Sequence, residues 1–159
     1  MTDKKFTVIS VKKIKKSRES YSVSIDNGVC ITLSSEVLIT YNINEKSKLS
    51  LSSIEEVVNA DQQLKIKNKI IFLLSYRMRS TAELNKLLLD KGFKKENITT
   101  VINKLIKRKY LDDEKFSKIY CKFLIKEKKL GRNLVLNKML IHRLPLTFIE
   151  SYIDDLYNI

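Results

Sequence analysis

The sequence predicts a mainly α-helical protein in which two tandem three-helix repeats form an elongated array, preceded by a small N-terminal strand-rich region with a β-hairpin. Two observations support this fold class. Apolar residues alternate with period two up to about residue 33 and recur at helical spacing from about residue 52 onward. The chain also aligns with itself at an offset of 51 residues without a gap. The predicted domains are a strand-rich region over 1–51, a linker helix with the first repeat over 52–110, and the second repeat over 111–159.

The strand-rich region contains two alternating runs joined by a turn sequence. The runs are Tyr21–Ile25 and Val29–Leu33, and Asn27-Gly28 lies between them. Asn-Gly supplies the positive φ angles of a type I′ turn, so the pattern predicts a β-hairpin. An earlier strand around Val8–Val11 is followed by a basic stretch, residues 12–20, which we interpret as an exposed loop.

The helix boundaries follow from capping and breaking residues. A serine followed three residues later by a glutamate has the spacing of a capping box, and this spacing occurs near residue 52 and again near residue 80. A glycine ends the helix that begins near residue 80, and three further breaks separate the later helices. The boundary residues are Ser52 with Glu55, Ser53 with Glu56, Ser80 with Glu83, Gly92, Leu111-Asp112, Gly131 and Pro145.

The internal repeat pairs apolar residues across three consecutive helices, over approximately residues 61–110 and 112–158. One register kept over three helices is harder to obtain by chance than a match within one helix. We therefore expect each unit to bury its apolar stripe against itself and its neighbour. The paired positions are Phe72/Phe123, Leu73/Leu124, Leu88/Met139, Leu89/Leu140, Ile98/Ile149, Ile102/Ile153 and Leu105/Leu156.

Composition excludes several classes of protein. With 159 residues, of which 43% are hydrophobic, the chain can build a core, and global disorder is not expected. Every apolar stretch is shorter than the roughly 18 residues of a membrane span, and the polar start lacks an apolar signal segment, so we predict a cytoplasmic protein without a membrane partner. Cys30 and Cys121 form no CxxC pair, so we expect two small buried side chains rather than a disulfide or a metal site.

Motifs for catalysis and cofactor binding are missing. The 3 glycines lie too far apart for either glycine-rich phosphate-binding motif, and a single histidine, His142, excludes zinc sites built on several histidines. We expect His142 to be partly exposed near a helix end. The acidic run Asp112–Glu114 is explained as the first turn of a helix with Asp112 as its N-cap. The sequence therefore predicts a non-enzymatic protein with no catalytic residues, no metal and no cofactor.

The charge distribution indicates a polyanionic partner. Lys and Arg number 31 against 18 Asp and Glu, which gives a net charge of +13. Residues 1–60 carry 9 basic and 7 acidic side chains, whereas residues 61–159 carry 22 and 11. A basic surface of this size attracts nucleic acid, or a protein assembled on nucleic acid. The alternative explanation for the excess of basic side chains is the lysine-rich amino-acid composition that an A·T-rich genome produces.

A row of lysines follows one long helix, which we predict from Asp112 to about Leu130. At 100° per residue these lysines occupy an arc of roughly 80° along roughly 21 Å of helix. Mutual repulsion lowers the stability of the helix unless counter-charges or bound phosphates relieve it, so a solvated face and a binding face both remain open. The row consists of Lys115, Lys118, Lys122, Lys126 and Lys129.

Four of the six arginines lie at or near predicted helix junctions. Guanidinium groups there can bind carboxylates or phosphates through two parallel hydrogen bonds. For Arg108 we favour a structural ion pair with Asp112 or Asp113. The candidates for binding are Arg77, Arg79 and Arg132.

Four segments, taken in order, resemble the RecX regulators of the RecA recombinase. They are residues 74–84 (LSYRMRSTAEL), Lys91-Gly92-Phe93, residues 110–117 (YLDDEKFS) and Gly131-Arg132, within a resemblance that covers about residues 54–157. The resemblance implies a short member of the family with two helical repeats, where other members commonly carry a third. It also implies a non-catalytic monomer that lies along the groove of the RecA–DNA filament. There it would limit filament growth, strand exchange and the accompanying ATP hydrolysis, in recombination, DNA repair and the SOS response.

The residue pattern and the resemblance agree on one hypothesis, in which a basic helical array enters a polyanionic groove. Its partners are the RecA filament and single- or double-stranded DNA, bound directly or through the filament. The five lysines and Arg132 would supply charge, while Arg77 and Arg79 would supply shaped contacts. The alternative is a stand-alone helical DNA-binding regulator of the transcription type, which needs base-reading side chains at the start of a recognition helix. A third hypothesis, that the protein is an enzyme, is supported only by Asp112–Glu114 and His142.

Overall fold

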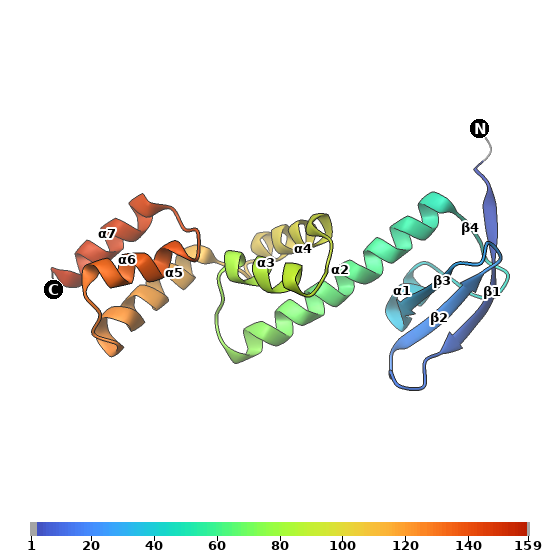
Figure 1. Ribbon diagram of the computed structural model, residues 1–159, viewed down its shortest axis with the longest axis horizontal. Coiled ribbons are helices and arrows are strands. Elements are labelled where there is room, and N and C mark those ends of the chain that lie inside the picture. Colours follow the sequence, from blue (N-terminus) through green and yellow to red (C-terminus); the bar gives the residue numbers. More distant parts are fainter. Residues whose placement is uncertain (1–2, 159) are drawn as a thin grey trace. The chain divides into compact units, whose positions relative to one another are not determined.

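The computed structural model describes residues 3–158, apart from the side chain of Phe148. The chain divides into two compact units, Met1–Lys65 and Ile66–Ile159. The prediction of a mainly helical protein with a small N-terminal strand region is confirmed (Figure 1). In chain order the elements are β1 (Lys5–Lys13), β2 (Ser20–Ile25), β3 (Cys30–Ser34), α1 (Ser35–Thr40), β4 (Lys48–Ser50), α2 (Leu51–Tyr76), α3 (Thr81–Asp90), α4 (Lys95–Lys107), α5 (Asp113–Lys122), the π-helical turn η1 (Phe123–Glu127), α6 (Arg132–Leu140) and α7 (Leu146–Tyr157).

The first unit is an antiparallel sheet packed against helices. The strand order is β3-β2-β1-β4, and all three pairings are antiparallel. Alternate side chains point to opposite faces of a strand, so Val8 is buried while its neighbour Ile9 is 60% exposed. The buried face packs against α1 and the first part of α2. Its core consists of Val8, Val23, Ile25, Leu33, Val37, Leu38, Ile43 and Val57.

The predicted hairpin of β2 and β3 is confirmed, but the type I′ turn is wrong. The loop has three residues rather than two, because the N–H of Gly28 donates to the carbonyl of Ile25 (3.0 Å) and the N–H of Ile25 donates to the carbonyl of Val29 (2.9 Å). Gly28 has a positive φ of 84°, whereas Asn27 does not. The side chain of Asn27 accepts a hydrogen bond from the N–H of Val29 (3.0 Å), which favours a type I turn followed by a left-handed glycine.

Helix α2 begins at Leu51, before both predicted capping boxes. β4 leads directly into the helix at Leu51, and the hydroxyl of Ser50 accepts the N–H of Ser53 (3.1 Å), so the predicted caps at Ser52 and Ser53 are wrong. Further along α2, the buried carboxylate of Asp61 accepts the N–H of Ser34 at the end of β3 (2.7 Å). These polar contacts fix both the start of α2 and its attachment to the sheet. The sequence also failed to predict the short elements α1 and β4.

The two cysteines lie in contrasting surroundings. Cys121 is fully buried as expected, and burial raises the pKa of its thiol to about 11. The expectation for Cys30 is wrong, because Cys30 is exposed at the start of β3 with its sulfur 3.0 Å from the hydroxyl of Ser22. The difference follows from strand alternation, which directs the side chain of Leu33 inward and that of Cys30 outward.

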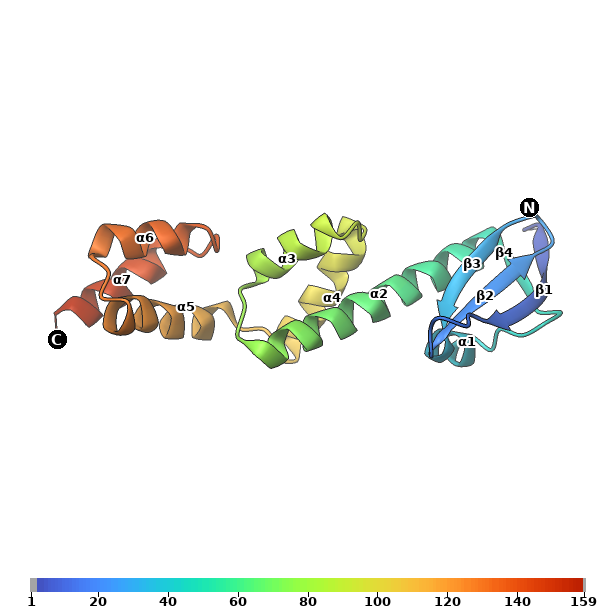
Figure 2. The same ribbon diagram turned by 60° about the horizontal axis from the view of Figure 1, so that its bottom comes forward.

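The second unit contains two groups of helices with separate cores (Figure 2). The first helical group consists of the end of α2, from Ile66, with α3 and α4. Ser80 caps α3 as predicted, because its hydroxyl accepts the N–H of Glu83 (3.2 Å), and Gly92 follows the helix with φ of 85°. The core of this group contains Ile66, Ile70, Leu84, Leu88, Ile98, Val101, Ile102, Leu105 and Leu111.

The second helical group consists of α5, η1, α6 and α7. Asp112 caps α5 as predicted, and its carboxylate accepts the N–H of Lys115 (2.9 Å). The predicted helix from Asp112 to Leu130 is wrong in its second half, where the chain winds as a π-helical turn and the helix ends at Glu127. The core of this group contains Phe116, Cys121, Leu124, Val135, Met139, Leu144, Ile149 and Ile153.

Five of the seven apolar pairs 51 residues apart have matching burial in the two helical groups, the exceptions being Leu73/Leu124 and Leu105/Leu156, in which one member is buried and the other half-buried. Leu88 and Met139 are both fully buried, as are Ile98 and Ile149. The exposed positions also match, since Leu89 is 42% exposed and Leu140 is 47% exposed. The periodicity that aligned the sequence therefore corresponds to the packing of side chains. Among residues 3–158, no helix combines the length and the apolar character needed to cross a membrane.

Candidate polyanion-binding surface

Three of the five predicted lysines form an open row on α5 and η1. Lys115, Lys122 and Lys126 are exposed, and within residues 3–158 none of them forms an ion pair. Lys118 is different, because its Nζ lies 2.9 Å from a carboxylate oxygen of Glu114 and 5.1 Å from the centre of the Tyr152 ring. Lys118 is therefore partly neutralised within the protein, and Lys115, Lys122 and Lys126, which we call the α5 lysine row, remain available to a partner.

The structure removes Lys129 from the predicted helix face. The π-helical turn places an extra residue in the last turn, with the N–H of Lys128 donating to the carbonyl of Phe123 (3.1 Å). Lys129 then lies beyond the helix with φ of 52°, in the left-handed conformation of a helix C-terminus. The prediction of one five-lysine stripe is therefore wrong, because it assumed an unbroken 100° rotation per residue.

The three candidate arginines form ion pairs within the protein. The guanidinium groups of Arg77 and Arg79 both bind the carboxylate of Glu83 in the first turn of α3. Arg132 at the start of α6 binds Asp154 of α7, with 3.0 Å between Nε and Oδ1. Arg77 and Arg132 keep about half of their side chains exposed (55% and 45%), whereas Arg79 keeps 16%. Arg77 and Arg132 can thus still contact a partner, while Arg79 mainly joins α3 to the turn that precedes it.

The expected ion pair of Arg108 is wrong. Arg108 has no ion pair within the described part of the chain, and both predicted acidic partners have other roles. Asp112 caps α5, while Asp113 accepts the N–H of Thr81 (2.9 Å) and the Thr81 hydroxyl (2.6 Å). Asp113 therefore connects the start of α3 to the start of α5.

The excess positive charge is larger in the first helical group than in the second. Residues 66–110 carry 12 basic and 3 acidic side chains, whereas residues 111–158 carry 9 and 7. The acidic residues of the second group gather at its helix ends, and Lys115 to Lys126 includes no carboxylate. The α5 lysine row is thus a local concentration of charge on a nearly balanced group. Sequence reasoning missed this contrast because it treated residues 61–159 as one basic region.

A polar contact that the sequence did not predict joins the two helical groups. The hydroxyl of Ser80 lies 2.6 Å from Nδ1 of His142, in the turn between α6 and α7, and the His142 ring packs on Phe116 and Tyr120. His142 is half-buried at a helix end, as expected. Burial lowers the pKa of His142, Arg77 lowers it further, and Glu83 and Asp113 oppose the shift. In the neutral tautomer protonated at Nε2, Nδ1 of His142 accepts a hydrogen bond from the Ser80 hydroxyl while Ser80 Oγ accepts the N–H of Glu83.

This contact has the atoms of a nucleophile and a base but not their accessibility. Ser80 is 0% exposed and its oxygen is occupied by the helix cap, so a substrate carbonyl cannot approach it. Cys121, the buried thiol, is held protonated by its raised pKa. Among residues 3–158, His, Cys, Asp and Glu side chains form no group of three or more that could hold a metal ion.

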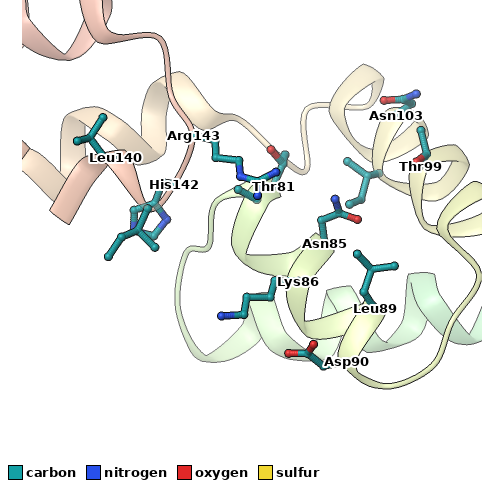
Figure 3. A pocket seen from close by; sticks show the side chains of 13 residues that line it. Thr81, Asn85, Lys86, Leu89, Asp90, Thr99, Asn103, Leu140, His142 and Arg143 are labelled. Atoms are coloured by element: carbon teal, nitrogen blue, oxygen red, sulfur yellow. The ribbon is translucent and has the colours of Figure 1, made fainter. Parts of the chain in front are cut away.

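Two cavities flank the contact between Ser80 and His142. One, of about 800 Å³, has both polar and apolar walls, and Figure 3 shows Asn85 of α3, Asn103 of α4 and Arg143 from the α6–α7 turn around it. The Oδ1 atom of Asn85 is buried there without a hydrogen-bond partner in the described chain. The other, of about 890 Å³, is mainly apolar and lies between α3 and α5. We call this second cavity the α3–α5 groove.

The fold and the surface define a mainly helical protein with a small N-terminal sheet, an exposed row of lysines and an apolar groove. Residues 67–105 match the family model described as RecX, first three-helix domain. The chain is 33% identical over 156 residues to regulatory protein RecX of Listeria monocytogenes serotype 4a, an alignment that covers 95% of this chain and 57% of the relative. It is 34% identical over 109 residues to regulatory protein RecX of Geobacillus sp., covering 66% of this chain and 40% of the relative.

A solved structure shows the same fold. The crystal structure titled regulatory protein RecX superimposes with a TM-score of 0.68 at 19% sequence identity, covering 95% of this chain and 74% of the other. The chain belongs to the RecX family. It spans about 57% of the length of the Listeria relative.

Proposed function

We propose that this chain is a non-catalytic regulator that binds the RecA–DNA filament and inhibits strand exchange and the coupled ATP hydrolysis. Membership of the RecX family supports this proposal, because the curated relatives are named regulatory proteins. The observation that carries the binding mode is the α5 lysine row, whose three exposed ammonium groups lack counter-charges within residues 3–158. A groove lined with phosphates supplies those counter-charges.

The proposed contact combines charge and shape. Lys115, Lys122 and Lys126 neutralise phosphates, and each neutralised phosphate releases counterions, so binding weakens steeply as salt rises. Lys118 and Lys129 contribute at the edges of the row, and the half-exposed guanidinium groups of Arg77 and Arg132 add directional contacts. Arg79 supports Arg77 by sharing Glu83.

The same proposal assigns a modular organisation to the chain. The two helical groups would be tandem three-helix repeats, with boundaries near residues 52–110 and 111–159, placed after a strand-rich region over residues 1–51. Matching burial at positions 51 residues apart supports this assignment, since homologous repeats keep the same core positions. Repeated modules would let one protein contact successive subunits of a filament.

Charge reversal on the row tests the proposal. The variant K115E/K122E/K126E should lose inhibition of RecA-coupled ATP hydrolysis on single-stranded DNA and lose binding to the filament in a co-sedimentation assay. The exposed positions make unfolding of this variant unexpected, and thermal unfolding followed by circular dichroism checks it.

Two matched variants sharpen this test. K13E/K15E/K16E changes the net charge equally in the first unit and should leave inhibition unchanged. K104E/K107E/K109E reverses charge in the first helical group, and full inhibition by this variant would support the assignment to α5. Unchanged inhibition by K115E/K122E/K126E would overturn the assignment. Sequence-specific binding to duplex DNA without RecA would instead favour a stand-alone DNA-binding regulator.

A further inference from the structure

Large, exposed apolar side chains line the α3–α5 groove. Its walls include Ile119, Phe123 and Ile141, which are 48%, 42% and 75% exposed, and Met78, which is 38% exposed. These residues come from η1, α5, the α6–α7 turn and the turn before α3, so they are brought together by folding rather than by one sequence motif. A gathering of large apolar side chains around one concave site is typical of a surface that binds a partner.

The α5 lysine row runs beside this groove. Lys115 and Lys122 lie four residues before and three residues after Ile119 on α5. Residues at these spacings are neighbours on the surface of an α-helix. Lys126 follows within the π-helical turn η1. On the α3 side, the carboxylate of Glu83 is already bound by Arg77 and Arg79. An apolar groove is therefore bordered along one wall by cations that lack partners within the described residues.

This combination favours a protein segment over a nucleic acid. Nucleic acid would satisfy the lysines but would leave the aliphatic side chains of the groove, Met78, Ile119 and Ile141, uncovered, because bases stack on aromatic faces. Here Phe116 and Tyr120 are stacked on each other with centroids 5.3 Å apart, and both pack on His142. An amphipathic helix inserts apolar residues at i, i+3, i+4 and i+7 into such a groove, and acidic residues on its flank would face the lysines.

We propose that the α3–α5 groove receives an acidic amphipathic helix of a protein partner. Its apolar stripe contacts Ile119, Phe123 and Ile141, and its carboxylates pair with Lys115, Lys122 and Lys126. A cavity of about 890 Å³ accommodates a few aliphatic side chains of such a stripe. The proposal rests on the proposed function and deepens it: each lysine of the α5 lysine row pairs either with a phosphate or with a carboxylate of this helix, and the groove adds an apolar contact to the partner.

A synthetic peptide provides the test. The probe is a fluorescent amphipathic helix of about 20 residues, about 30 Å long, built from leucine and glutamate with leucines at helical spacing. Fluorescence anisotropy should show binding to the full chain, and a scrambled peptide of the same composition should bind much more weakly. Equal binding of the two peptides, or no binding of the helical one, would overturn the proposal.

Variants separate the groove from the lysines. I119S/I141S should weaken peptide binding by roughly tenfold or more while leaving the binding of a single-stranded oligothymidylate unchanged. K115E/K122E/K126E should weaken both. The control I39S/L51S removes two exposed apolar side chains of the first unit, which are 79% and 63% exposed, and should change neither. Because I119S could disturb packing, I141S alone serves as a second groove variant, and unchanged peptide binding by both groove variants would overturn the proposal.

The outcomes distinguish this inference from the proposed function. Groove-dependent peptide binding by a chain that leaves RecA-coupled ATP hydrolysis unaffected would support the groove and overturn the proposed function. Inhibition of RecA by the wild-type chain, together with no peptide binding by that chain, would overturn the groove alone. Concentration-dependent dimerisation that I141S abolishes would show a second copy of the chain in the groove, which also contradicts the proposal.

Discussion

The two helical groups of the second unit share their core positions but differ where their helices end. Residues Phe72–Tyr76 close α2 as ordinary α-helix, whereas the equivalent residues Phe123–Glu127 wind as the π-helical turn η1. The next helix begins after Ser80 in the first group and after Gly131 in the second. Only the serine offers a hydroxyl, which caps its helix and contacts His142.

The surfaces of the two groups differ as well. In the first group Glu83 binds two arginines, whereas leucine occupies the equivalent position, Leu134, and is 55% exposed. The buried apolar residues therefore determine which helices pack together. A few polar residues at the helix ends determine which side chains each group exposes to a partner. Predictions on the paired positions can therefore test shared and divergent features separately.

The largest expected effect concerns the shared core. Leu88→Ala and Met139→Ala should each lower the free energy of unfolding by about 2–5 kcal/mol, because both side chains are fully buried and leave a cavity. The neighbouring exposed pair, Leu89→Ala and Leu140→Ala, should change it by about 0.5 kcal/mol or less. Urea unfolding followed by circular dichroism gives all four values. A large loss at Met139 with a negligible one at Leu88 would break the equivalence of the two cores.

An intermediate effect is expected at the two helix starts. Ser80→Ala should lower the free energy of unfolding by about 1–3 kcal/mol, since it removes the cap of α3 and leaves Nδ1 of His142 without its partner. Gly131→Ser should raise it by a few tenths of a kcal/mol, because a Cβ there meets nothing within 4 Å and a hydroxyl can cap α6. Calorimetric melting of both variants compares the two caps. If Ser80→Ala lowered the free energy of unfolding by no more than Gly131→Ser raised it, the contact of Ser80 with His142 would contribute nothing to stability.

The smallest expected effect is a pH dependence of the free energy of unfolding, which arises from His142 in contact with Ser80, the N-cap of α3. The pKa of His142 is lowered in the folded protein, so the unfolded chain takes up this proton first as pH falls. The contribution of neutral His142 to the free energy of unfolding is complete above about pH 6.5 and declines as the pH falls below that value. His142→Gln should therefore lose less stability than the wild type between about pH 7 and about pH 5, as measured by urea midpoints. Since Glu83, Arg77 and Asp113 remain in both proteins, identical pH profiles would count against the lowered pKa.

Features set by local sequence could be predicted. The hairpin followed from alternating runs, the caps at Ser80 and Asp112 followed from side chains that bond to the next turn, and the register of 51 residues followed from apolar spacing. Each of these depends on residues close in sequence or on a repeated pattern. The predicted turn type failed because the side chain of Asn27 bonds to Val29 and selects a different backbone.

The candidate site was harder to predict because it depends on distant residues. Ser80 and His142 are separated by 62 positions, and no spacing rule connects them. Glu83 was visible as a capping residue, and its spacing of four from Arg79 could have revealed their ion pair. The position of Lys129 depended on a π-helical turn over Phe123–Glu127, which the apolar spacing of the sequence does not reveal. Sequence reasoning therefore found the cations but not which of them are neutralised.

The contrast between the two thiols has a practical consequence. Reagents attack the thiolate form, and Cys121 is both shielded and held protonated, so the folded chain presents a single reactive sulfur at Cys30. That sulfur belongs to the first unit, whereas the α5 lysine row and the α3–α5 groove belong to the second. The natural sequence thus carries its own attachment point for one fluorophore per molecule, and labelling leaves the surfaces of interest chemically untouched.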